Sequence, residues 1–175
     1  MQLVALAISL MILAGFWMAR GRLNGLDLGF LAWNRTPAFA LVKAIGLGLL
    51  AALLVSGVFR DLRTGPLPPL AEIWMGITFG PLVEELIFRG ILFHGLMQLL
   101  RRWLRNPGWL VVIVIAAAFA LSHLVKTGIT PSQLATIFLT GSLYGWLRLE
   151  SGSTVPPFCA HVAYNAFLFG AAFVR

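Results

Sequence analysis

The chain has 175 residues, of which 59% are hydrophobic and only 11% are charged. An ordinary soluble domain carries roughly 25% charged residues, so this composition excludes a typical soluble domain and a disordered chain. The formal net charge is +7, but the basic residues lie in or beside short gaps between apolar runs and are not interleaved with aromatic residues. This pattern argues against nucleic-acid binding and favours contact with a lipid bilayer. The single cysteine, Cys159, excludes a disulfide framework within the chain.

Five apolar runs lack acidic and basic residues and approach the roughly 20 residues that a helix needs to cross a bilayer. In chain order they are 1–19, 44–59, 106–125, 127–147 and 151–174. A sixth segment, 70–100, is apolar except for Glu72, Glu84, Glu85 and Arg89. Gly76-xxx-Gly80 and Gly141-xxx-Gly145 predict close packing between helices. We therefore predict an all-α, polytopic membrane bundle of about six transmembrane helices, forming a single membrane domain over residues 1–175.

The first run, 1–19, has the apolar character of a secretory signal. It lacks a basic start, and Ala19-Arg20-Gly21 is a poor cleavage site, so we expect it to be retained as the first helix. The basic residues of the gaps favour an orientation with both chain ends outside. The inner loops then carry Arg20, Arg22, Arg35, Lys43, Arg101, Arg102, Arg105 and Arg148. The outer side then carries Arg60, Arg63, Lys126 and Arg175.

Charged residues within the segment 70–100 need a reason, because a charge at the bilayer centre costs at least about 2.5–3.5 kcal/mol. Glu85 and Arg89 are four residues apart, so they share a helix face and can form an ion pair. Glu84 points about 100° away from Glu85 and has no cationic partner at that spacing. Pro81 removes a backbone hydrogen bond just upstream and is expected to kink the helix. A structural ion pair explains Glu85 and Arg89, whereas the second glutamate indicates a function.

Two histidines and an asparagine lie on two later helices. His123 lies near the end of the fourth expected helix, and His161 and Asn165 are four residues apart in the last one, so these two face the same way. A single histidine on an apolar face is more often a packing residue than a ligand. Two histidines, an amide and a glutamate pair in one apolar bundle instead indicate a common site.

Three other reactive residues suit this site less well. His94 lies about 80° around the helix from Glu84 and is expected to have a packing or interfacial role. Cys159 is expected to be a small buried hydrophobic residue, because no base lies beside it. Ser122 precedes His123, but it lacks the Gly-x-Ser-x-Gly context of a nucleophilic serine.

A glutamate, two histidines and an amide donor suit hydrolysis by an activated water. Glu84 would take a proton from the water, and His123 would position it, either directly or through a metal ion. His161 and Asn165 would donate hydrogen bonds to the oxyanion of the tetrahedral intermediate. Zinc or another divalent metal held by Glu84, His123 and His161 is an alternative, because two histidines and a carboxylate form a known catalytic zinc set. The His-Glu-x-x-His helix of common zinc proteases is absent from the sequence, and we expect no other cofactor.

The ordered motifs of this chain resemble those of the CAAX protease and bacteriocin-processing family. The motifs are Glu84-Glu85-xxx-Arg89, Phe119-xxx-His123 and His161-xxx-Asn165. The resemblance covers about residues 70–175, which we interpret as the catalytic core, whereas the two helices in 1–69 carry no family motif. It implies an all-helical intramembrane endopeptidase, possessing either a metal or only water at its centre.

The resemblance also implies roles for individual residues. Glu84 and His123 would activate the water, and His161 and Asn165 would stabilise the transition state. The residues implied as supports of the centre are Glu85, Arg89 and Phe119.

The best-known members of this family cut a C-terminal tripeptide from prenylated proteins, which implies a membrane-associated or lipid-modified substrate. The short loops are typical of a minimal prokaryotic member in the cytoplasmic (inner) membrane, and prokaryotes lack the usual prenylated substrates. One alternative is a non-catalytic membrane partner, in bacteriocin immunity or as a scaffold. Another is a transporter or proton relay, although no inverted repeat or pair of broken helices is visible. The oligomeric state stays open.

Overall fold

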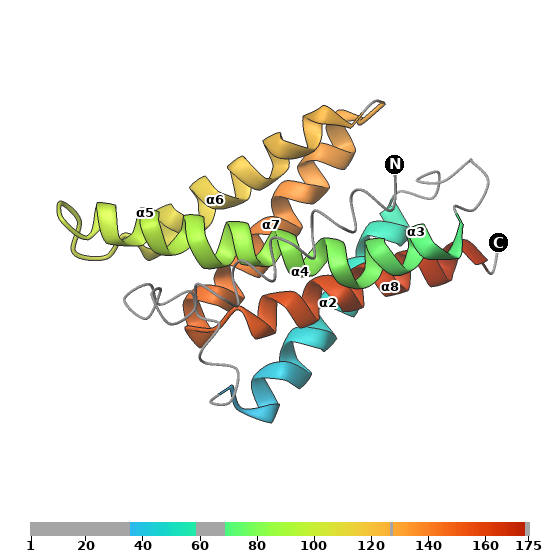
Figure 1. The fold of residues 1–175 in the computed structure, drawn as a ribbon, viewed down its shortest axis with the longest axis horizontal. Coiled ribbons are helices and arrows are strands. Elements are labelled where there is room, and N and C mark those ends of the chain that lie inside the picture. The colour runs from blue at the N-terminus through green and yellow to red at the C-terminus, as the bar shows by residue number, and fades with distance from the viewer. Residues whose placement is uncertain (1–35, 59–68, 127, 174–175) are drawn as a thin grey trace.

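The computed structural model describes residues 36–58, 69–126 and 128–173, and every regular element among them is a helix (Figure 1). The α-helices are α2 (Ala38–Val58), α3 (Leu70–Trp74), α4 (Gly80–Glu85), α5 (Phe93–Leu100), α6 (Gly108–Ser122), α7 (Pro131–Ser151) and α8 (Val155–Phe173). Two π-helical segments, η2 (Met75–Phe79) and η3 (Leu86–Leu92), connect α3, α4 and α5, and a 3₁₀ turn, η4 (His123–Val125), follows α6. The expected all-α fold is confirmed for these residues.

Five of the six expected membrane segments coincide with these helices. The first expected segment, 1–19, lies outside the described residues, and so do the basic residues Arg20, Arg22, Arg35, Arg60, Arg63 and Arg175. Within the described ranges, Ala38–Gly57 and Gly108–Val125 are long and apolar enough to cross a membrane. The number of six transmembrane helices therefore stays a prediction.

An unbroken run of helical segments from residue 70 to residue 100 carries Glu84, Glu85 and Arg89. Its hydrogen bonding changes from α to π in η2, directly before α4, and again in η3, directly after α4. Pro81 lies in the first turn of α4 and has no N–H to donate. The kink expected at Pro81 stays a prediction, and the observed feature is a π-helical segment on each side of α4. Such turns are frequent at functional sites.

Small residues bring the helices into close contact. Gly48 of α2 faces α8 so closely that a Cβ atom there would collide with the Ala160 carbonyl oxygen. A Cβ atom at Gly141 of α7 would lie 3.1 Å from the Phe119 ring, and one at Gly145 would lie 3.1 Å from Val112. The motif Gly141-xxx-Gly145 therefore packs α7 tightly on α6, as the sequence predicts.

The directions of the helices follow from contacts near their ends. Thr36 Oγ1 donates to Ser153 Oγ at 3.0 Å, just before the first turns of α2 and α8, so these two neighbouring helices start at the same end of the bundle. Gly108 at the start of α6 contacts Leu149 near the end of α7, so these two helices are antiparallel. The starts of α2, α6 and α8 therefore lie at the same end of the bundle as the end of α7.

The start of α7 is set by local hydrogen bonds. Thr130 Oγ1 accepts from the Gln133 N–H at 3.2 Å, and Gln133 Oε1 accepts from the Thr130 N–H at 2.9 Å, which forms a capping box. Pro131 occupies the first turn, where its missing N–H is not needed. The helix ends at Gly152, which has φ 66°. α7 therefore spans Pro131–Ser151 instead of the apolar run 127–147.

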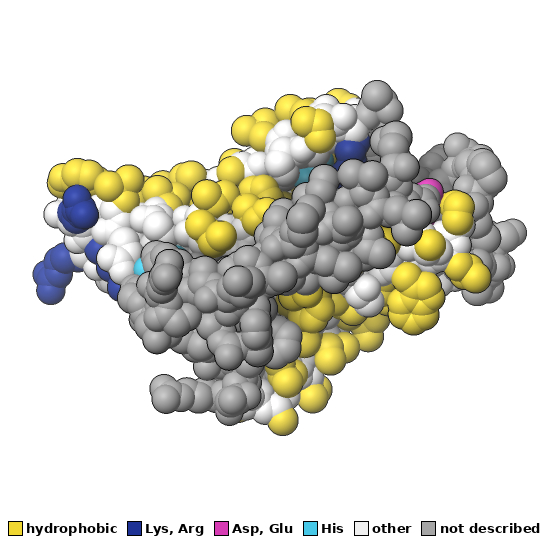
Figure 2. Space-filling model, in the orientation of Figure 1, with side chains coloured by type: hydrophobic (Ala, Val, Ile, Leu, Met, Phe, Trp, Pro, Cys, Tyr) yellow, Lys and Arg dark blue, Asp and Glu magenta, His cyan; other side chains and the backbone are white. Residues whose placement is uncertain are grey.

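The surface of the described bundle is rich in apolar side chains (Figure 2). Leu54 of α2, Leu121 of α6 and Leu139 of α7 are 61%, 58% and 66% exposed. A soluble monomer rarely exposes so much continuous apolar surface. This surface is suited to contact with lipid chains.

Candidate active site

A buried ion pair lies in the middle of the bundle. The side chains of Arg89 and Glu85 are 0% and 1% exposed, and Arg89 Nη1 donates to Glu85 Oε1 at 3.1 Å. Arg89 Nη2 donates to the Gly141 carbonyl of α7 at 2.8 Å. Arg148 Nε, also on α7, donates to the Arg89 carbonyl at 3.0 Å. The pair expected from the spacing of Glu85 and Arg89 is present, and it ties η3 to α7.

Glu84 follows the same helix but has different surroundings from its neighbour Glu85. Its side chain is 32% exposed, and its Oε2 lies 3.8 Å from His161 Nε2. This distance exceeds the length of a hydrogen bond, about 2.7–3.2 Å, and both groups can contact one water that lies beside them in the cavity. Glu84 is therefore the glutamate that is accessible to a small molecule.

Both histidines of the site are fixed through Nδ1. His161 Nδ1 lies 2.9 Å from Glu85 Oε1, and a carboxylate ionised beside Arg89 can only accept, so Nδ1 carries a hydrogen. His123 Nδ1 lies 2.9 Å from the Phe119 carbonyl oxygen, which also can only accept. In each neutral ring the hydrogen on Nδ1 leaves Nε2 with a free lone pair.

Asn165 lies one turn after His161 in α8. Its Nδ2 donates to the Gly76 carbonyl of η2 at 2.7 Å, which uses one of the two amide hydrogens. A Cβ atom at Gly76 would lie 3.1 Å from the ring of Phe169 in α8, so the two segments are in close contact. Asn165 therefore links α8 to the helix that carries Glu84, and its second amide hydrogen can serve another acceptor.

Two aromatic rings hold the charged and imidazole groups in place. The Phe119 ring meets the His123 ring at a centroid distance of 4.8 Å, and Arg89 Cζ lies 4.5 Å from the Phe119 ring centroid. Tyr144 is 1% exposed and stacks on His161, with centroids 4.7 Å apart and an interplanar angle of 23°. The family resemblance implies a supporting role for Phe119, but the sequence does not single out Tyr144. Its spacing of three residues from Gly141, on one face of α7, is the signal that could have found it.

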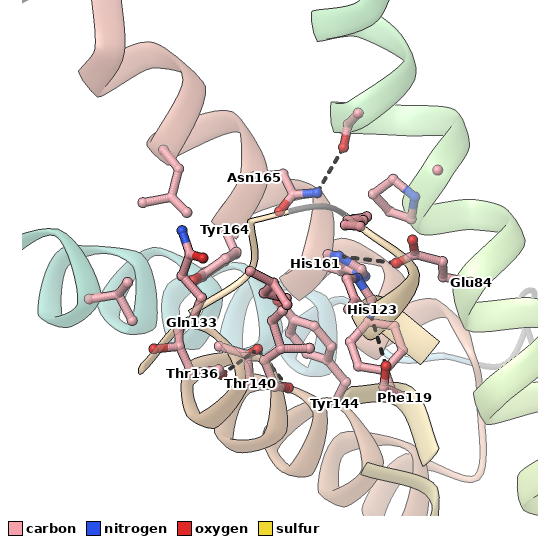
Figure 3. A pocket seen from close by; sticks show the side chains of 18 of the residues that line it. Glu84, Phe119, His123, Gln133, Thr136, Thr140, Tyr144, His161, Tyr164 and Asn165 are labelled. Carbon is pink, nitrogen blue, oxygen red and sulfur yellow. Dashed lines mark hydrogen bonds and ion pairs between the residues drawn. The ribbon is translucent and has the colours of Figure 1, made fainter. Parts of the chain in front are cut away.

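A cavity of about 530 Å³ adjoins these residues (Figure 3). Its lining residues include Glu84, Phe119, His123, Tyr144, His161 and Asn165. Further lining residues are Gln133, Thr136 and Thr140 on α7, and Lys126 and Gly128 in the loop after η4. The structure therefore brings to one cavity all four side chains that the sequence assigns to catalysis. Its volume lies within the range of small-molecule and peptide sites, roughly 300–1,000 Å³.

The donor atoms of Glu84, His123 and His161 are of the types found in catalytic zinc sites. The Nδ1 hydrogen bonds of the two histidines, from His161 to Glu85 and from His123 to the Phe119 carbonyl, are also of the kind that orients metal-bound histidines. In the described part of the chain, however, no three His, Cys, Asp or Glu side chains are grouped so that they could hold a metal ion. Zinc or another divalent metal held by these side chains stays a prediction.

The other reactive residues are absent from the cavity lining. His94 Nε2 lies 3.1 Å from Gln98 Nε2 on α5. Ser122 Oγ donates to the Phe119 carbonyl at 2.7 Å. Cys159 is half-buried and packs against the apolar cluster of Ala44, Tyr144, Leu147 and Ala160. The positions of His94 and Cys159 agree with the packing roles that the sequence predicts for them.

Comparison with known proteins gives one match. The family model described as Type II CAAX prenyl endopeptidase Rce1-like matches residues 66–167 of the chain. The matched segment contains the four cavity-lining residues Glu84, His123, His161 and Asn165. No curated protein and no solved structure gives a significant match.

Proposed function

This chain belongs to the type II CAAX prenyl endopeptidase Rce1-like family of membrane-embedded proteins, and from that premise we propose how it acts on a peptide bond. The chain is an intramembrane endopeptidase whose nucleophile is a water in the cavity that both Glu84 and His161 contact. The observation that carries this proposal is the 3.8 Å separation between Glu84 Oε2 and His161 Nε2, at a cavity that His123 and Asn165 also line.

A water beside these two groups donates one hydrogen to the Glu84 carboxylate and the other to His161 Nε2. Its oxygen lone pair then faces the scissile carbonyl carbon. Glu84 accepts the first proton as the water oxygen bonds to that carbon and the carbonyl becomes an oxyanion. Glu84 then gives the proton to the leaving nitrogen as the C–N bond breaks. A positioned general base of this type typically contributes about 10²–10⁴-fold to the rate.

The oxyanion of the intermediate needs hydrogen-bond donors. Asn165 can supply its second amide hydrogen while the first stays on the Gly76 carbonyl. His161 can donate from Nε2 only as an imidazolium, with Nδ1 still on Glu85. The assignment of His161 to the oxyanion therefore requires a protonated ring, whereas the neutral ring accepts from the water.

The substrate proposed for this site is a membrane-associated or lipid-modified peptide. The description of the family includes prenyl substrates. Part of the cavity wall is apolar and formed by Val55, Leu168 and Phe169. These side chains are suited to contact an apolar chain or a lipid attached to the substrate, while the polar end of the cavity holds the catalytic groups.

The test is a cleavage assay in lipid nanodiscs with a library of membrane-anchored fluorogenic peptides, prenylated peptides included. Glu84→Gln is expected to lower the rate by about 10²–10⁴-fold, as removal of a general base does. Glu72→Gln is the matched control, because Glu72 precedes Glu84 in the same helical segment and does not line the cavity. His123→Ala and His94→Ala form a second matched pair, in which His123 lines the cavity and His94, the control position, does not.

Full cleavage by Glu84→Gln would refute the mechanism. No cleavage of any peptide by the folded wild type would instead favour the non-catalytic membrane partner. Metal content is measured on the same samples. A stoichiometric metal that is present in the wild type and lost in His123→Ala would assign a metal-bound water to the site.

A further inference from the structure

A row of polar side chains on α7 forms part of the cavity wall. Gln133, Thr136 and Thr140 line the cavity, and Tyr144 continues the row one turn further along (Figure 3). Spacings of three and four residues place all of them on one face of the helix. Gln133 is half-buried, whereas Thr136 and Thr140 are 8% and 7% exposed. The row therefore leads from the more accessible part of the cavity to Tyr144, which stacks on His161.

The hydroxyl groups of the two threonines are bonded only within α7. Thr136 Oγ1 donates to the Ser132 carbonyl at 2.9 Å, and Thr140 Oγ1 donates to the Thr136 carbonyl at 2.9 Å. A hydroxyl has one hydrogen and two lone pairs, so each oxygen keeps its capacity to accept. Within the described ranges, neither hydroxyl bonds to another helix. The two oxygens are therefore acceptors for a molecule that occupies the cavity.

The spacing of these two acceptors suits an extended peptide. Thr136 and Thr140 are four residues apart, which corresponds to about 6 Å along the helix axis. In an extended chain, N–H groups two residues apart point to the same side and are separated by about 6.4–6.8 Å. A helical peptide does not offer such donors, because its N–H groups are bonded within the helix. The match therefore favours a peptide that is extended where it passes α7.

We propose that Thr136 and Thr140 bind the backbone of an extended substrate peptide, each accepting from one of two N–H groups that lie two residues apart. Gln133 Oε1 accepts from the Thr130 N–H, and Gln133 Nε2 can donate to a carbonyl on the same side of the peptide. The inference rests on the proposed peptidase function, since it describes how the substrate of that site is held. Because both positions need an N–H, it excludes proline from each of them.

The test measures peptide binding to the Glu84→Gln variant, which is expected to leave the peptide uncleaved. The probes are the membrane-anchored peptides of the cleavage library, and affinity is obtained from the rise in Tm with peptide concentration in detergent. The tightest binder is then N-methylated at one backbone amide at a time. Methylation at two positions, two residues apart, should weaken binding by about 2–10-fold, as expected for loss of one hydrogen bond. Proline at either position should weaken binding as well.

Threonine variants assign the two positions. Thr140→Val removes the acceptor and keeps the size of the side chain, so it should make binding insensitive to methylation at one of the two positions. Thr136→Val should do the same at the other, and Thr140→Ser, which keeps the oxygen, should bind as the parent does. Thr78→Val is the matched control. Thr78 Oγ1 also donates to a carbonyl four residues back, at 2.8 Å, but Thr78 does not line the cavity.

Three results would overturn the proposal: no peptide raises Tm, every amide is equally sensitive to methylation, or the pattern is unchanged by both valine variants. If the valine variants do not fold, the methylation pattern of the parent and the affinity of Thr140→Ser decide. The binding result is separate from catalysis. The expected binding pattern together with full cleavage by Glu84→Gln would refute the catalytic mechanism and leave the peptide site standing.

Discussion

Replacement of Glu85 by glutamine should destabilise this protein far more than the same replacement at Glu84. Glu85 and Arg89 are 1% and 0% exposed, and their nearest charged atoms are 3.1 Å apart. At an effective dielectric constant of about 20, this separation corresponds to an attraction of about 5 kcal/mol. Glu85→Gln keeps the shape of the side chain but leaves the Arg89 guanidinium buried without a counter-charge. Removal of one partner of a buried pair typically costs about 3–5 kcal/mol.

The assay is thermal unfolding in one detergent at one pH, followed by tryptophan fluorescence. For a chain of this length, 1 kcal/mol corresponds to about 2–4 °C in Tm, so Glu85→Gln should lower Tm by about 6–20 °C. Glu84→Gln is the matched control. Its side chain is 32% exposed and has no carboxylate–guanidinium partner, and a substitution of this kind usually changes stability by about 0.5 kcal/mol or less.

The double variant Glu85→Gln with Arg89→Met tests whether the two charges act as a pair. Because it removes the stranded charge, its Tm should fall by less than the sum of the two single effects. Strict additivity, or a Tm for Glu85→Gln within about 2 °C of that for Glu84→Gln, would refute the reasoning.

Two further stability predictions use the same assay. Gly48→Ala should cost about 1–3 kcal/mol, because its Cβ would collide with the Ala160 carbonyl, whereas Gly46→Ala, in open space on the same helix, should leave Tm unchanged or raise it. Equal effects at the two glycines would contradict the close approach of α2 and α8. Arg148→Met removes the donor to the Arg89 carbonyl and should cost about 1.5–3 kcal/mol, so an unchanged Tm would show that this bond does not stabilise η3.

The family and the main features of the site could be predicted from the sequence. The order of the glutamate, histidine and asparagine motifs predicted the family. The match of the family model to residues 66–167 confirms this prediction. The pairing of Glu85 with Arg89 was also predictable, because a spacing of four residues places two side chains together within one helix. The start of α7 was not predicted correctly, because apolar character continues across the loop. Only the capping box of Thr130 and Gln133 sets this boundary.

The contacts between helices could not be predicted from the sequence. Helical periodicity separates the directions of Glu84 and Glu85, but it does not say which of them accepts from His161 Nδ1, 76 residues away. The same holds for the stacking of Tyr144 on His161, and for the carbonyls of Gly76 and Gly141 that hold Asn165 and Arg89. These contacts depend on how closely the helices approach each other.

The sequence by itself determined that this chain is helical and suited to a membrane, because long apolar runs with few charges cannot remain soluble and cannot leave backbone groups unpaired in lipid. It also indicated which polar residues are candidates for a function, because each of them is costly to place in an apolar segment. Only the tertiary structure decided that Glu84 lines the cavity while Glu85 is buried. The physical reason is that periodicity acts within one helix, whereas a cavity is formed by the packing of several.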